Sequence, residues 1–319
     1  MIQFPGAHST HDPAGPQALL LDRLGDLLYL IATVVFVLVA AALLAALLRR
    51  RRADQDAEDP AREQRMATAV AIAAGATVAT LVAVLLLSFG TGRRLTAMPP
   101  PEALQIRVTG HQWWWEVEYR DAAPSHWATT ANEIHVPVGR PVALELHGAD
   151  VIHSFWVPNL GVKRDMIPGQ STSVWFQADA PGVYRGQCAE FCGQQHAMMG
   201  FLVVAEPPEQ FAAWLDRQRD SARTPADSLA RRGREVFLAS SCAMCHAVGG
   251  TPAGGRLGPN LTHVAGRRTI AAGTLPNVRG HLAGWIIDPQ QIKPGAHMPA
   301  NAIAPADLRA ILAYLESLR

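Results

Sequence analysis

Residues 188–199 read Cys188-Ala-Glu-Phe-Cys-Gly-Gln-Gln-His-Ala-Met-Met199, which places two thiols, an imidazole and a thioether within twelve residues. Such soft ligands favour copper over magnesium or calcium. A mononuclear blue-copper site uses one Cys, two His and a weak Met, so a second thiolate allows two sulfurs to bridge two copper ions. The stretch therefore predicts a binuclear copper site for electron transfer, with Cys188, Cys192, His196 and Met199 among its ligands.

The second imidazole of such a site must come from elsewhere in the chain. The best candidate is His153, which follows an apolar strand-like run in Asp150-Val-Ile-His-Ser-Phe-Trp156. The backbone carbonyl of Glu190, inside the loop, is the candidate for the remaining weak ligand. A structural thiol pair or a zinc site is the alternative, but zinc would leave Met199 without a role. Of the other histidines, His135 and His147 are predicted to be core or surface residues, and His111 and His126 stay open.

Short strand-like runs surround this motif and are separated by Gly, Pro and Asp turns. They lie at 105–108, 113–119, 133–136, 142–146, 173–176 and 201–204. Runs of this length and spacing predict an antiparallel sandwich over residues 105–207. A Pro-rich linker, 91–104, precedes it, and a connecting helix is predicted over 208–227.

A second motif, Cys242-Ala-Met-Cys-His246, is typical of covalent attachment of a c-type haem. Cys242 and Cys245 would form the thioethers, and His246 would ligate the iron. A thioether is expected on the other face, and Met298 in Lys293-Pro-Gly-Ala-His-Met-Pro299 is the candidate, with His297 and His281 as alternatives. The helical pattern of residues 228–319 predicts an all-α haem domain. Two disulfides are the alternative for the chain's four cysteines, but each pair has a histidine at ligand spacing.

Two uncharged runs, 27–48 and 67–90, are long enough to cross a bilayer as helices, which takes about 20 residues. Buried soluble helices are the alternative. The loop at 49–66 carries six arginines and segment 1–26 only Arg23, which predicts a cytoplasmic loop with both termini outside. Arg93 and Arg94 argue the other way but are outnumbered. The first run differs from a signal peptide because its positive charges follow it.

The two parts of the chain that are predicted to be exported differ in net charge. Residues 105–207 hold ten Asp/Glu against six Lys/Arg, and residues 228–319 hold ten Lys/Arg against four Asp/Glu. A basic haem domain tethered to an acidic copper domain is expected to dock on it. The net charge of +1 gives no reason to invoke a nucleic acid, and no basic block interleaved with aromatics occurs.

Three segments together resemble subunit II of cytochrome c oxidase over roughly residues 20–205. They are the Cys-x-Glu-x-Cys-Gly-x-x-His-x-x-Met motif, His153-Ser-Phe-Trp-Val-Pro158, and Gly110-His-Gln-Trp-Trp-Trp-Glu-Val-Glu-Tyr119. Residues 228–319 resemble a class I cytochrome c, through Gly258-Pro-Asn-Leu261, Trp285-Ile-Ile-Asp-Pro289 and the Met-Pro pair. The combination is similar to the cytochrome-c-fused oxidases.

The resemblance implies a two-helix transmembrane hairpin, an all-β cupredoxin sandwich and an all-α class I cytochrome c domain. It implies a copper A centre with six ligands: His153, Cys188, the carbonyl of Glu190, Cys192, His196 and Met199. The Glu190 carboxylate would reach a magnesium ion at the contact with subunit I, and Pro259 would support the histidine side of the haem. Electrons would arrive at Trp113, although Trp114 stands where the family usually has Tyr. Glu63 lacks the nearby Trp of the family pattern and is predicted to be a solvated loop charge.

The resulting hypothesis is the subunit through which electrons enter a cytochrome c oxidase, an oxidoreductase and translocase of the respiratory chain. Its implied partners are subunit I, subunit III, the lipid bilayer and an electron donor, either a c-type cytochrome or a quinol-oxidising complex. Its place would be the bacterial plasma membrane, crossed twice, with the copper and haem domains on the outer side. The alternatives are a copper protein of a different terminal reductase, such as the nitrous-oxide type, a copper-free quinol oxidase subunit, and a non-enzymatic copper-binding redox protein.

Overall fold

The computed structural model describes residues 8–50 and 60–319 of the chain. They form two compact units, one made of Leu19–Ala97 and the other of the segment up to Ala18 together with Met98–Arg319. Arg51 and Arg52 of the predicted cytoplasmic loop lie outside the described residues, as does the first part of the predicted exported segment 1–26.

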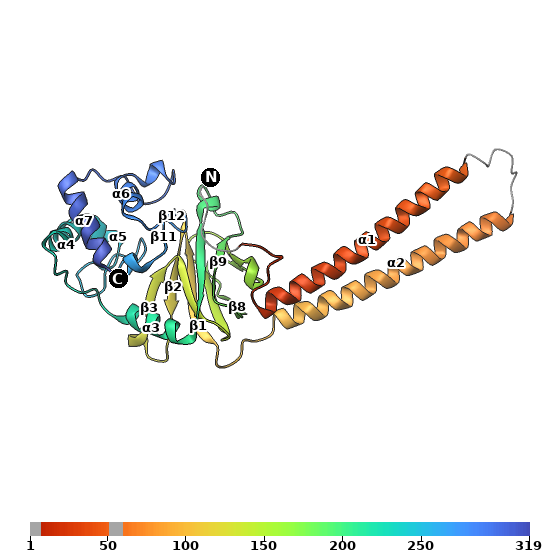
Figure 1. Cartoon of the computed structure of the whole chain (residues 1–319), viewed down its shortest axis with the longest axis horizontal. Helices are drawn as coiled ribbons and strands as arrows, with labels where there is room; N and C mark the ends of the chain where they lie inside the picture. Colours follow the sequence, from red (N-terminus) through yellow and green to blue (C-terminus); the bar gives the residue numbers. More distant parts are fainter. Residues whose placement is uncertain (1–7, 51–59) are drawn as a thin grey trace. The chain divides into compact units, whose positions relative to one another are not determined.

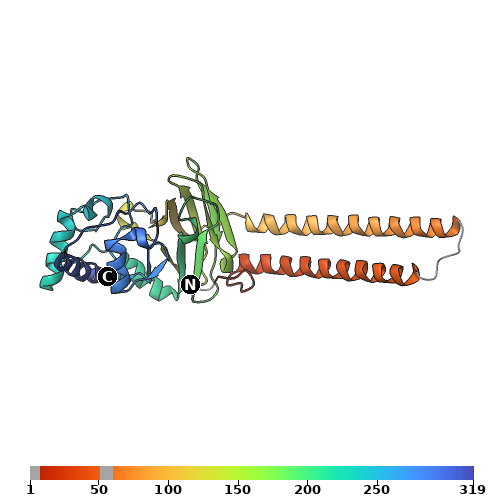
Figure 2. The ribbon, with the colours of Figure 1, turned by 90° about the horizontal axis from the view of Figure 1, so that it is seen from above.

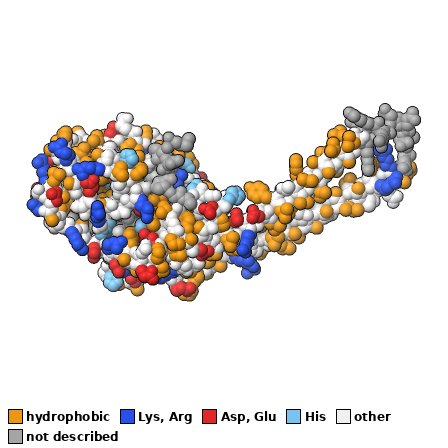
Figure 3. Space-filling model, in the orientation of Figure 1, with side chains coloured by type: hydrophobic (Ala, Val, Ile, Leu, Met, Phe, Trp, Pro, Cys, Tyr) orange, Lys and Arg blue, Asp and Glu red, His pale blue; other side chains and the backbone are white. Residues whose placement is uncertain are grey.

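The smaller unit consists of two long helices that run in opposite directions (Figures 1 and 2). They are α1 (Pro16–Arg50) and α2 (Pro60–Leu95), and each contains one of the two predicted apolar runs. Apolar side chains cover the visible faces of both helices (Figure 3), and no residue of α2 is buried within the structure. Both helices are long and apolar enough to cross a membrane. A helix that is apolar all round needs an apolar environment, which lipid supplies.

Glu63 lies in the first turn of α2 and is exposed. A negative charge at this position interacts favourably with the unpaired N–H groups of the helix start. This interaction with the start of α2 is sufficient to explain a glutamate at position 63.

The other unit begins with a sandwich of two five-stranded sheets, which confirms the predicted fold class. The first sheet has the order β3-β2-β1-β5-β8, and the second has the order β4-β10-β9-β6-β7. The strands of the first are β1 (Leu104–His111), β2 (Trp114–Tyr119), β3 (Ala128–Ala131), β5 (Val142–Gly148) and β8 (Thr172–Phe176). Those of the second are β4 (Glu133–Pro137), β6 (His153–Val157), β7 (Val162–Met166), β9 (Gly182–Cys188) and β10 (Gly200–Glu206).

Most neighbouring strands are antiparallel, but β1 pairs with β5, and β4 with β10, in parallel. The predicted antiparallel sandwich thus needs correction at these two pairs. A parallel pair needs a crossover connection, and the intervening strands supply it here.

Buried and partly buried side chains alternate along the strands, and the buried ones form the core of the sandwich. Trp115, Val117 and Tyr119 of β2 are buried while their neighbours are only partly so. The ring of Trp115 packs edge-on against Phe155 of β6 and Phe201 of β10. In the register of the second sheet, Phe155 stands opposite Cys188, the last residue of β9. The aromatic core therefore fixes the strand ends that carry two of the predicted copper ligands.

The sandwich continues into α3 (Pro208–Arg219), which ends well before the limit of the predicted connecting helix at residue 227. Trp214 of α3 stacks on His135 with ring centroids 4.1 Å apart. The imidazole of His135 lies 3.1 Å from the carboxylate of Glu206 and 3.8 Å from that of Glu133. Of the two predicted environments, core and surface, His135 therefore occupies the core.

His135 makes stability depend on pH. Burial lowers the pKa of His135, but Glu133 and Glu206 outweigh it and raise the pKa above its ordinary value. A group whose folded pKa is raised stabilises the fold below its unfolded pKa, about 6.5, and this contribution is lost as pH rises through the folded pKa. We expect His135→Gln to cost about 1–3 kcal/mol of unfolding free energy near pH 6, and less near pH 9.

Urea unfolding at the two pH values measures this difference. His126→Gln is the control, because the His126 side chain is 63% exposed and its change should be small at both pH values. An equal loss of unfolding free energy for His135→Gln at both pH values would show that protonation of His135 does not stabilise the fold.

Residues 228–319, the predicted haem domain, are built on two crossing helices, α4 (Ser228–Ala239) and α7 (Pro305–Ser317), with α5 (Cys242–Cys245) and α6 (Arg279–Ile287) beside them. Asp227 begins α4 by accepting a hydrogen bond from the backbone N–H of Ala230. Phe237 of α4 and Tyr314 of α7 pack edge-on in the core. This part of the described chain departs from the predicted all-α domain by a short ladder, β11 (Thr269–Ile270) with β12 (Leu275–Pro276), and by an isolated bridge between Ala247 and Gly254.

Candidate copper and haem sites

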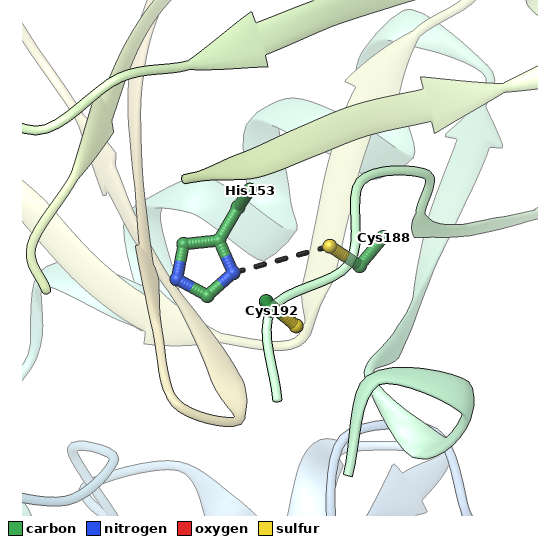
Figure 4. Close-up of side chains that lie close together, drawn as sticks. All are labelled: His153, Cys188 and Cys192. Atoms are coloured by element: carbon green, nitrogen blue, oxygen red, sulfur yellow. Dashed lines mark hydrogen bonds between the residues drawn. The ribbon is translucent and has the colours of Figure 1, made fainter. Parts of the chain in front are cut away.

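His153, Cys188 and Cys192 converge at one end of the sandwich (Figure 4). One ligand atom from each lies within 4.8 Å of the others, and all three residues are buried. Nδ1 of His153 is 3.9 Å from Sγ of Cys188. Thirty-five residues separate this pair in sequence, and the pairing of β6 with β9 brings them together.

The other three predicted ligands surround the same spot. Sγ of Cys192 lies 3.6 Å from Nδ1 of His196 and 3.7 Å from Sδ of Met199. The carbonyl oxygen of Glu190 lies 3.1 Å from Sγ of Cys188. Two thiols, two ring nitrogens, a thioether and a carbonyl thus face a common point, a donor set that fits copper.

The two thiols strongly affect each other's ionisation. The neighbouring Cys192 thiol, with help from His153, lowers the pKa of Cys188 well below its ordinary value. Cys188 and burial in turn raise the pKa of Cys192. The pair therefore loses its first proton readily and holds the second. Only deprotonated sulfur is a good metal ligand, so a metal that binds both sulfurs must displace the second proton.

Asp150, which the sequence did not single out, orients His153. Its Oδ1 accepts a hydrogen bond from Nε2 of His153 at 2.8 Å, so Nδ1 is the nitrogen that faces the thiols. Its carboxylate also accepts from the backbone N–H groups of Gln112 and Val151, each at 2.7 Å. Burial raises the pKa of Asp150, but these hydrogen bonds outweigh it and lower the pKa. A carboxylate behind a ligand histidine is a common support in metal sites.

We expect Asp150→Asn to weaken copper binding about 10- to 100-fold, because an amide holds the imidazole less firmly in this orientation. Copper titration of the purified chain against a competing chelator measures the change. Asp216→Asn is the control, since the Asp216 side chain is 74% exposed on α3. Wild-type affinity in Asp150→Asn would show that the hydrogen bond does not support the ligand.

The three consecutive tryptophans have separate environments. Trp113 lies in the turn between β1 and β2, where its Nε1 donates to the carbonyl of Cys192 at 3.0 Å. Nε2 of Gln112 donates to the same carbonyl at 2.8 Å. Trp114 stacks on His111, and Trp115 lies in the core. Trp113 is thus joined directly to a predicted copper ligand.

Gly193, next in sequence after Cys192, is required for this contact. Its φ is +110°, and a Cβ there would come within 3.0 Å of both the Trp113 ring and the Gln112 amide. Glycine therefore lets the copper loop approach the turn closely.

In the haem domain, His246 follows the turn of α5 that carries Cys242 and Cys245. Nδ1 of His246 donates to the carbonyl of Pro259 at 2.8 Å, which leaves Nε2 as the ligand nitrogen. Desolvation lowers the pKa of His246, favouring the neutral form that binds iron. A Cβ on Gly258 would come within 2.6 Å of the imidazole. All four cysteines are free thiols in the structure, so the disulfide alternative has no support there.

Met298 is half-buried, and its carbonyl accepts a hydrogen bond from Nε2 of Gln290 at 2.9 Å. The two alternative axial ligands have other contacts. The ring of His297 lies tilted beside that of Trp113, with centroids 5.3 Å apart, and Nδ1 of His281 donates to the carbonyl of Pro276. Ligation by Met298 stays a prediction.

The chain thus combines two apolar helices, a cupredoxin-like sandwich and a helical domain with a c-type haem attachment motif, the combination of a membrane-anchored copper and haem protein. Residues 124–206 match the family described as cytochrome c oxidase subunit II, periplasmic domain, and residues 230–319 match the cytochrome c family. These matches imply copper and haem c.

Two sequence relatives are cytochrome c oxidase subunits 2. The chain is 38% identical over 315 residues to cytochrome c oxidase subunit 2 of Alkalihalophilus pseudofirmus, covering 97% of this chain and 90% of that one. It is 34% identical to the subunit 2 of Bacillus sp. strain PS3, covering 67% of this chain and 62% of that one. A crystal structure of the periplasmic domain of subunit II from Bradyrhizobium japonicum is 34% identical, covering 38% of this chain and 97% of that one, at a TM-score of 0.36. The chain belongs to the cytochrome c oxidase subunit 2 family and ends in a cytochrome c domain, which confirms the predicted resemblance.

Proposed function

We propose that this chain is the subunit through which electrons enter a cytochrome c oxidase, passing from a donor through haem c and a binuclear copper A centre to subunit I. The observation that carries the proposal is the convergence of both thiols with His153, His196, Met199 and the Glu190 carbonyl. A copper-free quinol oxidase subunit would have no use for this donor set. A copper-delivery protein would have no use for a haem attachment motif.

When bound, the two centres supply one-electron redox chemistry, and oxygen reduction belongs to subunit I. The chain's own residues hold and orient them. Cys188 and Cys192 would hold the coppers, Cys242 and Cys245 would tether the haem, and His246 with Met298 would ligate its iron. Asp150 fixes the His153 ring, and Trp113, bonded to the Cys192 carbonyl, would be where electrons reach the copper side.

The wider arrangement is also part of the proposal. Residues 1–26 lie outside, 27–48 and 67–90 span the bacterial plasma membrane, and 49–66 form the cytoplasmic loop. Residues 91–104 link to the copper domain at 105–207, and residues 208–227 connect to the haem domain at 228–319. Subunits I and III are partners, and the donor is a c-type cytochrome or a quinol-oxidising complex. The exposed Glu190 carboxylate would reach magnesium shared with subunit I.

Metal analysis of the full chain, purified with its partners, tests the proposal. We expect two coppers and one covalent haem per chain, a mixed-valence dicopper signal in electron paramagnetic resonance, and oxidation of reduced cytochrome c with oxygen uptake. One copper or none would favour the alternatives. Two coppers and a haem without oxygen uptake would favour a different terminal reductase.

A further inference from the structure

Lys293 is in an unusual environment for a lysine. The chain has 28 basic residues, of which only Lys163 and Lys293 are lysines. Lys163 is exposed on β7, whereas Lys293 is 2% exposed. Lysine is almost never fully buried unless its charge is compensated, so this position needs a physical reason.

Three backbone carbonyls accept hydrogen bonds from the Lys293 amine, and burial lowers the pKa of Lys293 to about 7. Nζ of Lys293 donates to the carbonyl of Met198 at 2.8 Å and to those of Trp113 and Ala271 at 3.3 Å each. An ammonium group has three donors, so each can be matched. Among the described residues no carboxylate lies within ion-pair distance of Lys293.

These carbonyls come from both domains. Met198 precedes the predicted copper ligand Met199, and Trp113 is bonded to the carbonyl of Cys192. Ala271 belongs to the haem domain, as Lys293 does. One ammonium group therefore joins the haem domain to the turn and loop that frame the copper site.

Other contacts across the same interface are also buried hydrogen bonds. The Glu133 carboxylate, 2% exposed, accepts from the backbone N–H groups of Arg268 at 2.6 Å and Thr269 at 2.9 Å. The N–H of Gly200 donates to the carbonyl of Ala272 at 3.0 Å. In the described part of the chain no ion pair joins residues 105–207 to residues 228–319, so the predicted charge attraction between the domains has no contact ion pair in this interface.

The position of Lys293 bears directly on the path between the two centres. Four residues further along the chain, the ring of His297 lies 5.3 Å from that of Trp113, and Met298 follows it. Trp113 in turn donates to Cys192. The contact between His297 and Trp113 thus joins the predicted axial ligand of the haem to the copper loop, and Lys293 lies at the base of this segment.

We propose that Lys293 fastens the haem domain to the copper loop and is the positioning residue that keeps His297 against Trp113 for electron transfer between the two centres. The electron-transfer role rests on the proposed function above, whereas the fastening role does not.

Amine labelling tests the fastening in the wild-type complex. A lysine-specific acylating reagent is applied to the folded protein, and the labelling rates of Lys293 and Lys163 are followed by mass spectrometry, each relative to the denatured chain. We expect Lys293 to be labelled at least about 10-fold more slowly than Lys163, as for a group that reacts only when the domains separate. Equal rates would overturn the proposal whether or not copper and haem are present.

Variants test the positioning. We expect Lys293→Met to slow electron transfer from photoreduced haem to copper at least about 10-fold, while copper content, haem content and reduction of the haem by its donor stay unchanged. Lys293→Arg keeps the charge and the donors and should retain more of the rate, and Lys163→Met is the matched control. A wild-type rate in Lys293→Met would overturn the positioning role. Absence of copper or haem from the wild-type chain would instead refute the proposed function. If Lys293→Met fails to assemble, the labelling experiment still decides the fastening.

Discussion

Replacing Cys192 with serine (Cys192→Ser) will leave the copper site with at most one ion and without a mixed-valence signal. Cys192 is 2% exposed, and its sulfur lies within 4 Å of both His196 and Met199. A serine hydroxyl is a hard, protonated ligand that cannot bridge two coppers. Because one ion would lose its bridge, we expect copper affinity and electron passage to subunit I to fall by more than about 100-fold.

Copper analysis and paramagnetic resonance of the purified variant measure this result. The matched control is Cys242→Ser, which removes one sulfur from the haem attachment motif instead. We expect that variant to keep both coppers and to hold its haem through one thioether. Two coppers with an intact mixed-valence signal in Cys192→Ser would refute the bridging role and with it the binuclear site.

The second large effect is expected at Gly233→Ala, where α4 crosses α7. A Cβ at Gly233 would lie 1.9 Å from the backbone carbonyl oxygen of Ala310 and 2.9 Å from the Tyr314 side chain. Since a backbone carbonyl cannot rotate away, the two helices must separate. Overpacking of this kind typically costs about 1–3 kcal/mol of unfolding free energy. Because the clash here is with the main chain, we expect Gly233→Ala to cost at least about 3 kcal/mol.

Thermal unfolding of the full chain, followed by haem absorbance, measures this loss. Gly280→Ala in α6 is the control, because a Cβ there meets nothing within 4 Å. We expect the control to be neutral or to stabilise the domain by about 0.5–1 kcal/mol, since alanine favours a helix over glycine. Unfolding of Gly233→Ala at the wild-type temperature would show that the crossing can relax.

The predicted ligands that lie in local motifs could be proposed from the sequence, because thiolates and imidazoles at fixed spacing have few other uses. His153, far away in sequence, was predicted because it follows an apolar strand-like run, and the structure brings it beside Cys188. Asp150 was missed, since a carboxylate beside a turn is ordinary surface chemistry until the fold places His153 against it.

The contact between the domains could not be predicted from the sequence, for a related reason. Lysines and glutamates are usually solvated, so nothing in the sequence distinguishes Lys293 or Glu133 from surface residues. The charge counts predicted attraction between the domains, but they could not show which groups are buried. The parallel pairing of β1 with β5 and of β4 with β10 was missed because alternation reveals which face a residue occupies and not which strand is its neighbour.

The position of the His297 ring beside Trp113 has a kinetic consequence. A separate cytochrome reaches such a surface by collision, so its rate falls on dilution. Here both rings belong to one polypeptide, and the step between them is unimolecular. Its rate should be the same in a dilute and a concentrated preparation, and a soluble protein competing for the Trp113 surface would first have to displace a domain that is already seated there.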